Sequence, residues 1–207
     1  MNRFVVTGTN TDIGKTVFAA ALTHALDGCY WKPVQAGLEG GTDAKRVAAL
    51  TGLAPDRILP EVWRLQTPAS PHHAADLESV RIEPDALTPP TCARPLVIEG
   101  AGGALVPLNH EVLFADVFAR WGLPTIVCAS TALGTINHSL LTLEALRSRN
   151  VTVLGIAFIG DANDSSEAAI VRFGQVRRLG RLPWLDTLTP DTLRSAFAAG
   201  FDLGDFQ

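Results

Sequence analysis

The chain has 207 residues, of which 47% are apolar and 18% are charged, and its formal net charge is −4. This length and composition suit one globular unit with a sizeable core, so we expect a single domain over residues 1–207. A net negative charge gives no broad positive field for a nucleic acid or an anionic membrane, and neither is expected as a partner.

The first apolar run, residues 4–7, is far too short for a signal-peptide core or a membrane span, which predicts a cytoplasmic protein. Cys29, Cys92 and Cys128 lie far apart, in or beside apolar runs. Because free cysteine is among the residues most often buried, we expect three reduced core residues and not a disulfide framework.

Apolar runs at residues 4–7, 95–98, 125–129 and 153–159 have the length of strands buried on both faces. Helical spacing over residues 17–26 and 140–149, and a short strand at 29–31, lie between them. This alternation predicts an α/β fold with a mostly parallel sheet and helices on both faces. Residues 65–95 are rich in proline and predict connections around a short helix.

A phosphate-binding loop is predicted at residues 8–16, GTNTDIGKT, between the first strand and the first helix. Its backbone N–H groups and the following helix N-terminus would surround an anion. We expect Lys15 to reach the outer phosphates of ATP and the Thr16 hydroxyl to hold Mg²⁺. Five residues separate Gly8 from Gly14 where the usual pattern has four, so the loop is a variant.

Charged residues follow two other predicted strands. Glu99 comes after the second long apolar run, directly before a glycine-rich turn, and would face Mg²⁺. Lys32 follows the strand at 29–31, and at the same edge of a parallel sheet it could neutralise a transferred phosphoryl group. Asp43 begins a helical pattern, and spacing leaves open whether it caps that helix or contacts the metal.

Two loop motifs carry polar groups as well. Asn137 and His138 follow Gly134 at the start of a predicted helix, where backbone N–H groups could bind a carboxylate. His72 and His73 have no partner at metal-ligand spacing, so we expect packed loop residues.

Together these motifs resemble the dethiobiotin synthetase family. The match includes the phosphate loop, Lys-Pro-Val at 32–34, Ser-Pro-His at 70–72, EGAGG at 99–103, Phe-Ala-Asp at 114–116, GTINH at 134–138 and Leu-Pro-Trp-Leu at 182–185. The resemblance implies a P-loop NTPase-like homodimer with its active site at the interface. It also implies a ligase that forms dethiobiotin, ADP and phosphate from 7,8-diaminopelargonic acid, CO₂ and Mg-ATP, through a carbamate and a carbamic-phosphoric anhydride.

The resemblance also assigns roles to residues of these motifs. Catalysis is assigned to Lys15 and Lys32, and the metal to Thr16, Asp43 and Glu99. Nucleotide contacts are assigned to Asp12, Ile13, Gly14, Lys15, Thr16, Val17, Glu99, Gly100, Ala101, Gly102, Pro183, Trp184 and Leu185. Substrate contacts are assigned to Thr11 and, across the dimer, to Gly134, Thr135, Ile136 and Asn137.

Two segments depart from the family pattern. Residues 35–37, Gln-Ala-Gly, stand where relatives often have a serine that touches the substrate. Residues 158–161, Phe-Ile-Gly-Asp, stand where relatives can carry an Asn-Asp pair that reads adenine. Whether Gln35 or Ala36 replaces the serine, and which nucleoside triphosphate is preferred, therefore stay open.

Two rival functions share the phosphate loop. One is another amide-forming P-loop ligase, but those with a glutamine-hydrolysing domain need more than 207 residues. The other is a ParA/MinD-like switch ATPase, which usually has a second lysine early in the loop. This chain has Thr9, Asn10 and Thr11 at the equivalent positions.

Overall fold

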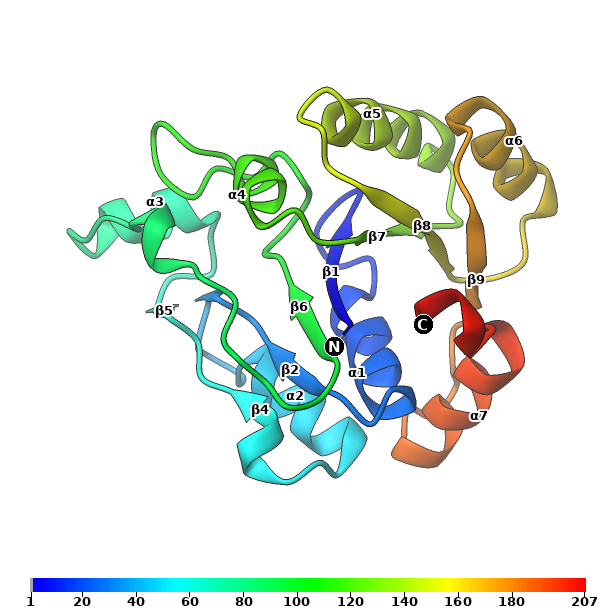
Figure 1. Ribbon diagram of the computed structural model, residues 1–207, viewed down its shortest axis with the longest axis horizontal. Helices are drawn as coiled ribbons and strands as arrows, with labels where there is room; N and C mark the ends of the chain where they lie inside the picture. Colours follow the sequence, from blue (N-terminus) through cyan, green and yellow to red (C-terminus); the bar gives the residue numbers. More distant parts are fainter. Residues whose placement is uncertain (1) are drawn as a thin grey trace.

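A computed structural model of the chain describes residues 2–207 (Figure 1). Its main feature is a seven-stranded sheet in the order β4-β2-β6-β1-β7-β8-β9, and every pairing is parallel. The strands are β1 (Arg3–Gly8), β2 (Cys29–Trp31), β4 (Ile58–Leu59), β6 (Leu96–Glu99), β7 (Thr125–Ser130), β8 (Val153–Ile159) and β9 (Arg178–Leu182). A separate parallel pair joins β3 (Val34–Ala36) to β5 (Trp63–Leu65).

Helices cover both faces of the sheet, as predicted (Figure 1). One face packs on α1 (Lys15–Ala25), α2 (Asp43–Thr51) and α7 (Pro190–Gly200). The other packs on α4 (Phe114–Trp121), α5 (Thr135–Arg147) and α6 (Asp164–Gly174), while α3 (Pro71–Leu77) packs on the separate β3·β5 pair. Short 3₁₀ turns are η1 (Pro55–Arg57), η2 (Pro84–Ala86) and η3 (Leu203–Phe206). No helix in residues 2–207 is long and apolar enough to cross a bilayer.

The predicted α/β class and the buried central strands are confirmed, whereas the expectation of a loop at His72 and His73 is wrong. Both residues lie in α3, which begins at Pro71 because proline is favoured in the first turn of a helix. Strand β9 was not predicted, since Arg178 and Arg181 interrupt its apolar pattern. Both arginines approach the buried carboxylate of Glu167, which makes them compatible with this edge strand.

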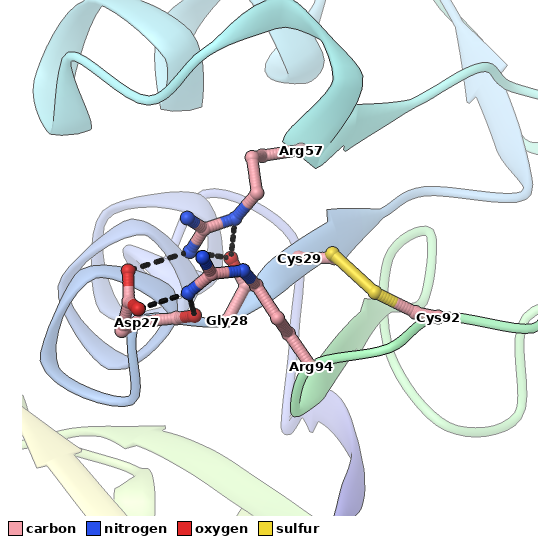
Figure 2. Close-up of a disulfide and its surroundings, with 6 residues drawn as sticks. All are labelled: Asp27, Gly28, Cys29, Arg57, Cys92 and Arg94. Atoms are coloured by element: carbon pink, nitrogen blue, oxygen red, sulfur yellow. Dashed lines mark hydrogen bonds and ion pairs between the residues drawn. A yellow bond between two sulfur atoms is a disulfide. The ribbon is translucent and has the colours of Figure 1, made fainter.

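The cysteines differ from the prediction. Cys29 at the start of β2 and Cys92 in the segment before β6 form a disulfide (Figure 2), so the expectation of three reduced cysteines is wrong for this pair. Parallel pairing of Cys29 with Leu96 brings the segment before β6 beside β2, although 63 residues separate the cysteines. Cys128 is free and buried, as predicted. Burial raises the pKa of its thiol far above the usual value.

The same corner of the sheet holds an ion-pair cluster. The guanidinium groups of Arg57 and Arg94 both meet the carboxylate of Asp27, and Arg57 Nε also donates to the Gly28 carbonyl at 2.8 Å (Figure 2). These contacts hold the turn between α1 and β2 against η1 and the segment before β6. They lie at the amino ends of the strands, opposite the predicted site.

The last residues of the chain are packed into the core. Phe206 is fully buried and its ring lies 6.1 Å from Phe4 and 6.2 Å from Phe197, measured between centroids. Its carbonyl accepts a hydrogen bond from the Asn2 amide. The C-terminal 3₁₀ turn therefore ties β1 to α7.

Phe206→Ala should reduce the free energy of unfolding by about 3–5 kcal/mol, because it leaves a ring-sized cavity between three elements. Leu203→Ala, in the same turn, should reduce the free energy of unfolding by about 1 kcal/mol or less, because the Leu203 side chain is 41% exposed. Urea unfolding of both variants measures the difference. Equal losses would show that Phe206 does not anchor the C-terminus.

Candidate active site

The phosphate loop joins β1 to α1 at the carboxyl edge of the sheet. Gly14 precedes α1 in a left-handed conformation with φ of 92°, which favours glycine. A Cβ at Gly8 would lie 2.9 Å from Cδ of Lys15, so the absence of a side chain there lets Lys15 fold back over the loop. The ammonium group of Lys15 donates to the Asn10 carbonyl at 2.8 Å. This arrangement sets a cation and a helix N-terminus beside one another, which suits an anion.

Lys15 is only 6% exposed. Burial lowers the pKa of its ammonium group, and the nearby carboxylate of Glu99 opposes that shift. A buried ammonium group with one carbonyl partner gains stabilisation when a phosphate arrives, since phosphate supplies the missing negative charge.

Three elements bring oxygen ligands together. The hydroxyl of Thr16, in the first turn of α1, lies 2.8 Å from Glu99 Oε1 and 3.1 Å from Asp43 Oδ1, and it can donate to either. Glu99 ends β6 and Asp43 begins α2. The side chain of Thr42 caps α2 by accepting from Lys45 N, so the alternative role of Asp43 as that cap is excluded.

Lys32 bridges the two carboxylates. Its ammonium nitrogen is 2.5 Å from Asp43 Oδ2 and 3.1 Å from Glu99 Oε1. Burial by itself lowers the pKa of Lys32, but Glu99 and Asp43 outweigh it and raise the pKa overall. For Asp43, burial acts to raise the pKa, and Lys32 outweighs it so that the pKa falls. The lysine is therefore held as a cation between two anions.

The donor set fits Mg²⁺. Residues 2–207 contain no cluster of three or more His, Cys, Asp or Glu side chains able to cage a metal. Mg²⁺ does not need such a cage, because it usually binds one or two carboxylates together with substrate phosphates and water. One hydroxyl and two carboxylates beside a phosphate loop match that requirement, with Thr16, Asp43 and Glu99 as the oxygen donors.

Two cavities meet at this cluster. We call the first the loop cavity, of about 410 Å³, and the second the adjoining cavity, of about 520 Å³. The residues that line both are Thr11, Asp12, Lys32, Asp43 and Gly102. Groups bound in the two cavities would therefore meet at a boundary that includes Lys32 and Asp43.

Most of the predicted site residues surround these cavities. The loop cavity is lined by Thr11, Asp12, Gly14, Lys15, Thr16, Val17, Lys32, Asp43, Glu99, Gly102 and Trp184, together with Arg46, which was not predicted. Ala101 lines the adjoining cavity, with Gln35 and Ser70 among its other walls. Ile13, Gly100, Pro183 and Leu185 line neither cavity.

The predicted substrate contacts on α5 lie elsewhere. Gly134 caps α5 in a left-handed conformation, and Thr135, Ile136 and Asn137 form its first turn. They line neither cavity. A surface hollow of about 300 Å³ next to this helix is lined by Thr9, Asn10, Thr11, Gly103, Ala104, Leu105, Val106, His138, Leu141 and Thr142.

Tyr30 is a site neighbour that was not predicted. Its hydroxyl donates to Glu99 Oε2 at 2.8 Å, and the ring is fully buried. Burial and the charge of Glu99 raise the pKa of Tyr30 well above its usual value, so the phenol stays a donor. Strand alternation puts Tyr30 on the same face as Lys32, a signal that the sequence offered.

Gln35, at the wall of the adjoining cavity, stabilises the loop between β3 and α2 through its side-chain amide. Its side-chain oxygen accepts from Asp43 N at 3.0 Å. Its amide nitrogen lies 3.2 Å from the carbonyl oxygens of both Ala36 and Gly37. Gln35 is 6% exposed, and its amide is engaged in holding the loop between β3 and α2.

Comparisons with known proteins give both a family and a fold. Residues 2–192 match a family model described as an AAA domain. The ATP-dependent dethiobiotin synthetase BioD of Rhizorhabdus wittichii is 64% identical over 202 residues, which is 98% of this chain and 97% of that protein. The protein of the same name from Rhodopseudomonas palustris is 64% identical over 99% of this chain and 98% of its own length.

Two solved structures share the fold. The MinC:MinD cell division protein complex of Aquifex aeolicus superposes with a TM-score of 0.55 at 11% identity, over 95% of this chain and 86% of that chain. A ParA family ATPase from Chlorobium tepidum gives 0.53 at 11% identity, over 94% and 96%. At this identity the likeness extends to the fold alone.

Gln35→Ala should lower the free energy of unfolding by about 1–2 kcal/mol, because it leaves the part-buried N–H of Asp43 without its partner. Lys45→Ala, at an exposed position in the same helix, should change it by about 0.5 kcal/mol or less. Urea unfolding monitored by circular dichroism compares them. If both variants match the parent, Gln35 does not brace α2.

Proposed function

Because the chain belongs to the ATP-dependent dethiobiotin synthetase family, we propose that its loop cavity holds ATP and its adjoining cavity holds the diamine, 7,8-diaminopelargonic acid. The enzyme is an ATP-dependent ligase that forms dethiobiotin. The observation that carries the assignment of the cavities is the position of Lys32, at their junction and between two carboxylates.

In the proposed complex the triphosphate lies along the phosphate loop, with Lys15 at its outer phosphates. Mg²⁺ held by Thr16, Asp43 and Glu99 would neutralise phosphate charge. These three side chains hydrogen-bond to one another or to Lys32 in the structure. A divalent cation on the same oxygens competes with the lysine for them, which leaves Lys32 able to turn to the transferred phosphoryl group.

The proposed reaction has three steps. One amine of the substrate adds to CO₂ and loses a proton, which gives a carbamate. A carbamate oxygen then attacks the γ-phosphorus, the bond to the ADP oxygen breaks, and a carbamic-phosphoric anhydride forms. The second amine attacks the anhydride carbon and loses a proton, the bond from that carbon to the phosphate oxygen breaks, and the ureido ring closes as phosphate leaves. Each of these species is anionic, so Lys15 and Lys32 act by electrostatic stabilisation and by alignment.

Gln35 and Gly160 are the two positions at which the chain departs from the family pattern beside the proposed substrate and nucleotide sites. The Gln35 amide is already engaged by the loop, so we propose that it braces the adjoining cavity and does not replace the serine contact. A Cβ at Gly160 would lie 2.4 Å from Thr131 Oγ1 and 3.2 Å from Trp184 Nε1. No side chain at position 160 reads the base, and we propose that the wall at Trp184 accepts ATP by shape and stacking.

We propose that the enzyme is a cytoplasmic homodimer of single-domain subunits. Large apolar side chains are exposed around the start of α5, which is unusual for a free surface: Leu105 is 47% exposed, Leu133 106%, Ile136 37% and Leu141 55%. Pairing of this surface would bring the backbone N–H groups of Gly134 to Asn137 to a second subunit. There they would receive the substrate carboxylate, as a helix N-terminus can.

Lys15→Gln and Lys32→Gln should each lower turnover at least about a hundredfold, because each removes a cation from a site where anions accumulate. The measurement is ADP release with Mg-ATP and bicarbonate, with and without the diamine. Release by the parent should depend on the diamine. If the Lys32→Gln variant has a native circular dichroism spectrum and turns over close to the parent rate, Lys32 takes no part in the chemistry.

The proposed preference for ATP is tested by repeating the assay with CTP and GTP.

Leu141→Glu should separate the dimer, because it places a charge within the exposed apolar surface around α5. Leu77→Glu is the matched control, since Leu77 is 58% exposed on the distant helix α3. Sedimentation should give monomers for Leu141→Glu alone, with loss of activity. A parent that sediments as a monomer, or a Leu141→Glu variant that remains dimeric, would contradict this interface.

A further inference from the structure

Glu99 is a buried carboxylate whose two oxygens have separate partners. Oε1 lies 2.8 Å from the Thr16 hydroxyl and 3.1 Å from the Lys32 ammonium group, on the side of the loop cavity. Oε2 accepts a hydrogen bond of 2.8 Å from the hydroxyl of Tyr30. Glu99 is 1% exposed and Tyr30 is fully buried, so water does not compete for that bond.

Strand pairing explains why this contact forms. In the parallel pair β2·β6, Tyr30 lies opposite Val97. Side chains alternate along a strand, so Tyr30 and Lys32 project from the same face of the sheet as Val97 and Glu99. The neighbouring strand therefore presents two groups to one carboxylate: a phenol from within the core cluster and a cation at the edge of the sheet.

A hydrogen bond to one carboxylate oxygen is needed if Glu99 is to present only its other oxygen to the loop cavity. The last torsion of a glutamate side chain is broad and roughly two-fold, so either oxygen can point the same way. The Tyr30 ring is packed among apolar residues of the core and its hydroxyl has a fixed position. A donor on Oε2 holds the carboxylate plane and leaves Oε1 toward the cavity. Mg²⁺ favours this one-oxygen mode, because it demands near-octahedral geometry.

We propose that Tyr30 is a positioning residue: its hydroxyl holds Glu99 Oε2 so that Oε1 alone is presented to Mg²⁺ and Lys32. The proposal rests on the proposed function, since it takes the metal to be bound at Thr16, Asp43 and Glu99. Tyr30 itself touches neither nucleotide nor diamine, because it lines neither cavity. Its effect is exerted through Glu99.

A purely structural role for the hydroxyl would be to satisfy a buried carboxylate oxygen. Loss of such a bond lowers stability wherever it occurs, but it leaves metal binding unchanged. Thr23→Val provides the matched control, because Thr23 is fully buried on α1 and its hydroxyl donates only to the Ala19 carbonyl. This control removes a buried hydroxyl from α1, a helix that packs into the same core cluster as Tyr30, away from Glu99.

The experiment compares ADP binding by calorimetry with Mn²⁺ and with EDTA, for the parent, Tyr30→Phe, Thr23→Val and Glu99→Gln. The ratio of the two affinities measures how much the metal strengthens binding. We expect this ratio to fall about tenfold in Tyr30→Phe, from the loss of one charge-assisted hydrogen bond, and to stay at the parent value in Thr23→Val. In EDTA, both Tyr30→Phe and Thr23→Val should bind ADP with the affinity of the parent. Tyr30→Phe should also lower kcat with Mg-ATP while KM for the diamine stays constant.

Two other results have different meanings. If Glu99→Gln lowers the ratio and Tyr30→Phe keeps the parent value, the metal site stands and the role of Tyr30 is overturned. If Glu99→Gln itself keeps the parent value, the metal site is wrong and the role of Tyr30 falls with it. Diamine-dependent ADP release by the parent would still identify the ligase in either case.

A measurement on the parent sequence avoids any effect of the substitution on folding. Tyr30 is the single tyrosine of the chain, so protein grown with 3-fluorotyrosine gives one ¹⁹F resonance. We expect that resonance to shift when Mg²⁺ is added to the ADP complex, because the metal changes the charge on the carboxylate that the phenol contacts. A resonance that does not move at saturating Mg²⁺ would overturn the proposal.

Discussion

The ammonium group of Lys32 between the carboxylates of Glu99 and Asp43 is the interaction on which the rest of the site depends. Glu99 is buried and Asp43 is partly buried beside it, so the two carboxylates repel each other and lose hydration, and a positive charge between them stabilises both. Lys32 meets that need at 2.5 Å and 3.1 Å. Because the three groups come from β2, β6 and α2, their pairing also holds together the strand ends that form both cavities.

Strand pairing in the sheet fixes the positions of these charged groups relative to one another. Glu99 ends β6, Lys32 directly follows the adjacent parallel strand β2, and β6 pairs with β1, which leads into the phosphate loop. Neighbouring strands lie about 4.8 Å apart, so residues at three successive strand ends fall within reach of one ligand. Asp43 joins them from a helix, and its position depends on Thr42 as the cap and on Gln35 as the brace.

Much of this could be predicted from the sequence, and the limits have physical causes. The phosphate loop, Lys32 and Glu99 were visible because each directly follows an apolar run, and parallel strands end at one edge. Contacts set by packing across long separations were not visible: the disulfide of Cys29 with Cys92 and the edge strand β9 depend on segments distant in the sequence. The role of Gln35 was not visible for another reason, because its bonds to Asp43 N and to two neighbouring carbonyl oxygens depend on how the loop between β3 and α2 folds. Tyr30 lies between these cases. The alternation of side chains along β2 predicts that Tyr30 is on the same face of the sheet as Lys32, whereas its partner Glu99 follows only from the register of β2 against β6.

The MinC:MinD cell division protein complex and the ParA family ATPase share this fold at 11% identity, so the fold by itself does not identify a function. The function has to be argued from the side chains at the strand ends. Lys32 is bound to anions on one side and faces the adjoining cavity on the other. In the complex that we propose, a metal ion that displaced Lys32 from the carboxylates would shift positive charge toward that cavity, and metal binding would be coupled to substrate activation through one ammonium group. That proposed coupling would need Glu99 in a fixed orientation, and the bond from Tyr30 to Glu99 Oε2 means that the neighbouring strand β2 contributes to this orientation as well.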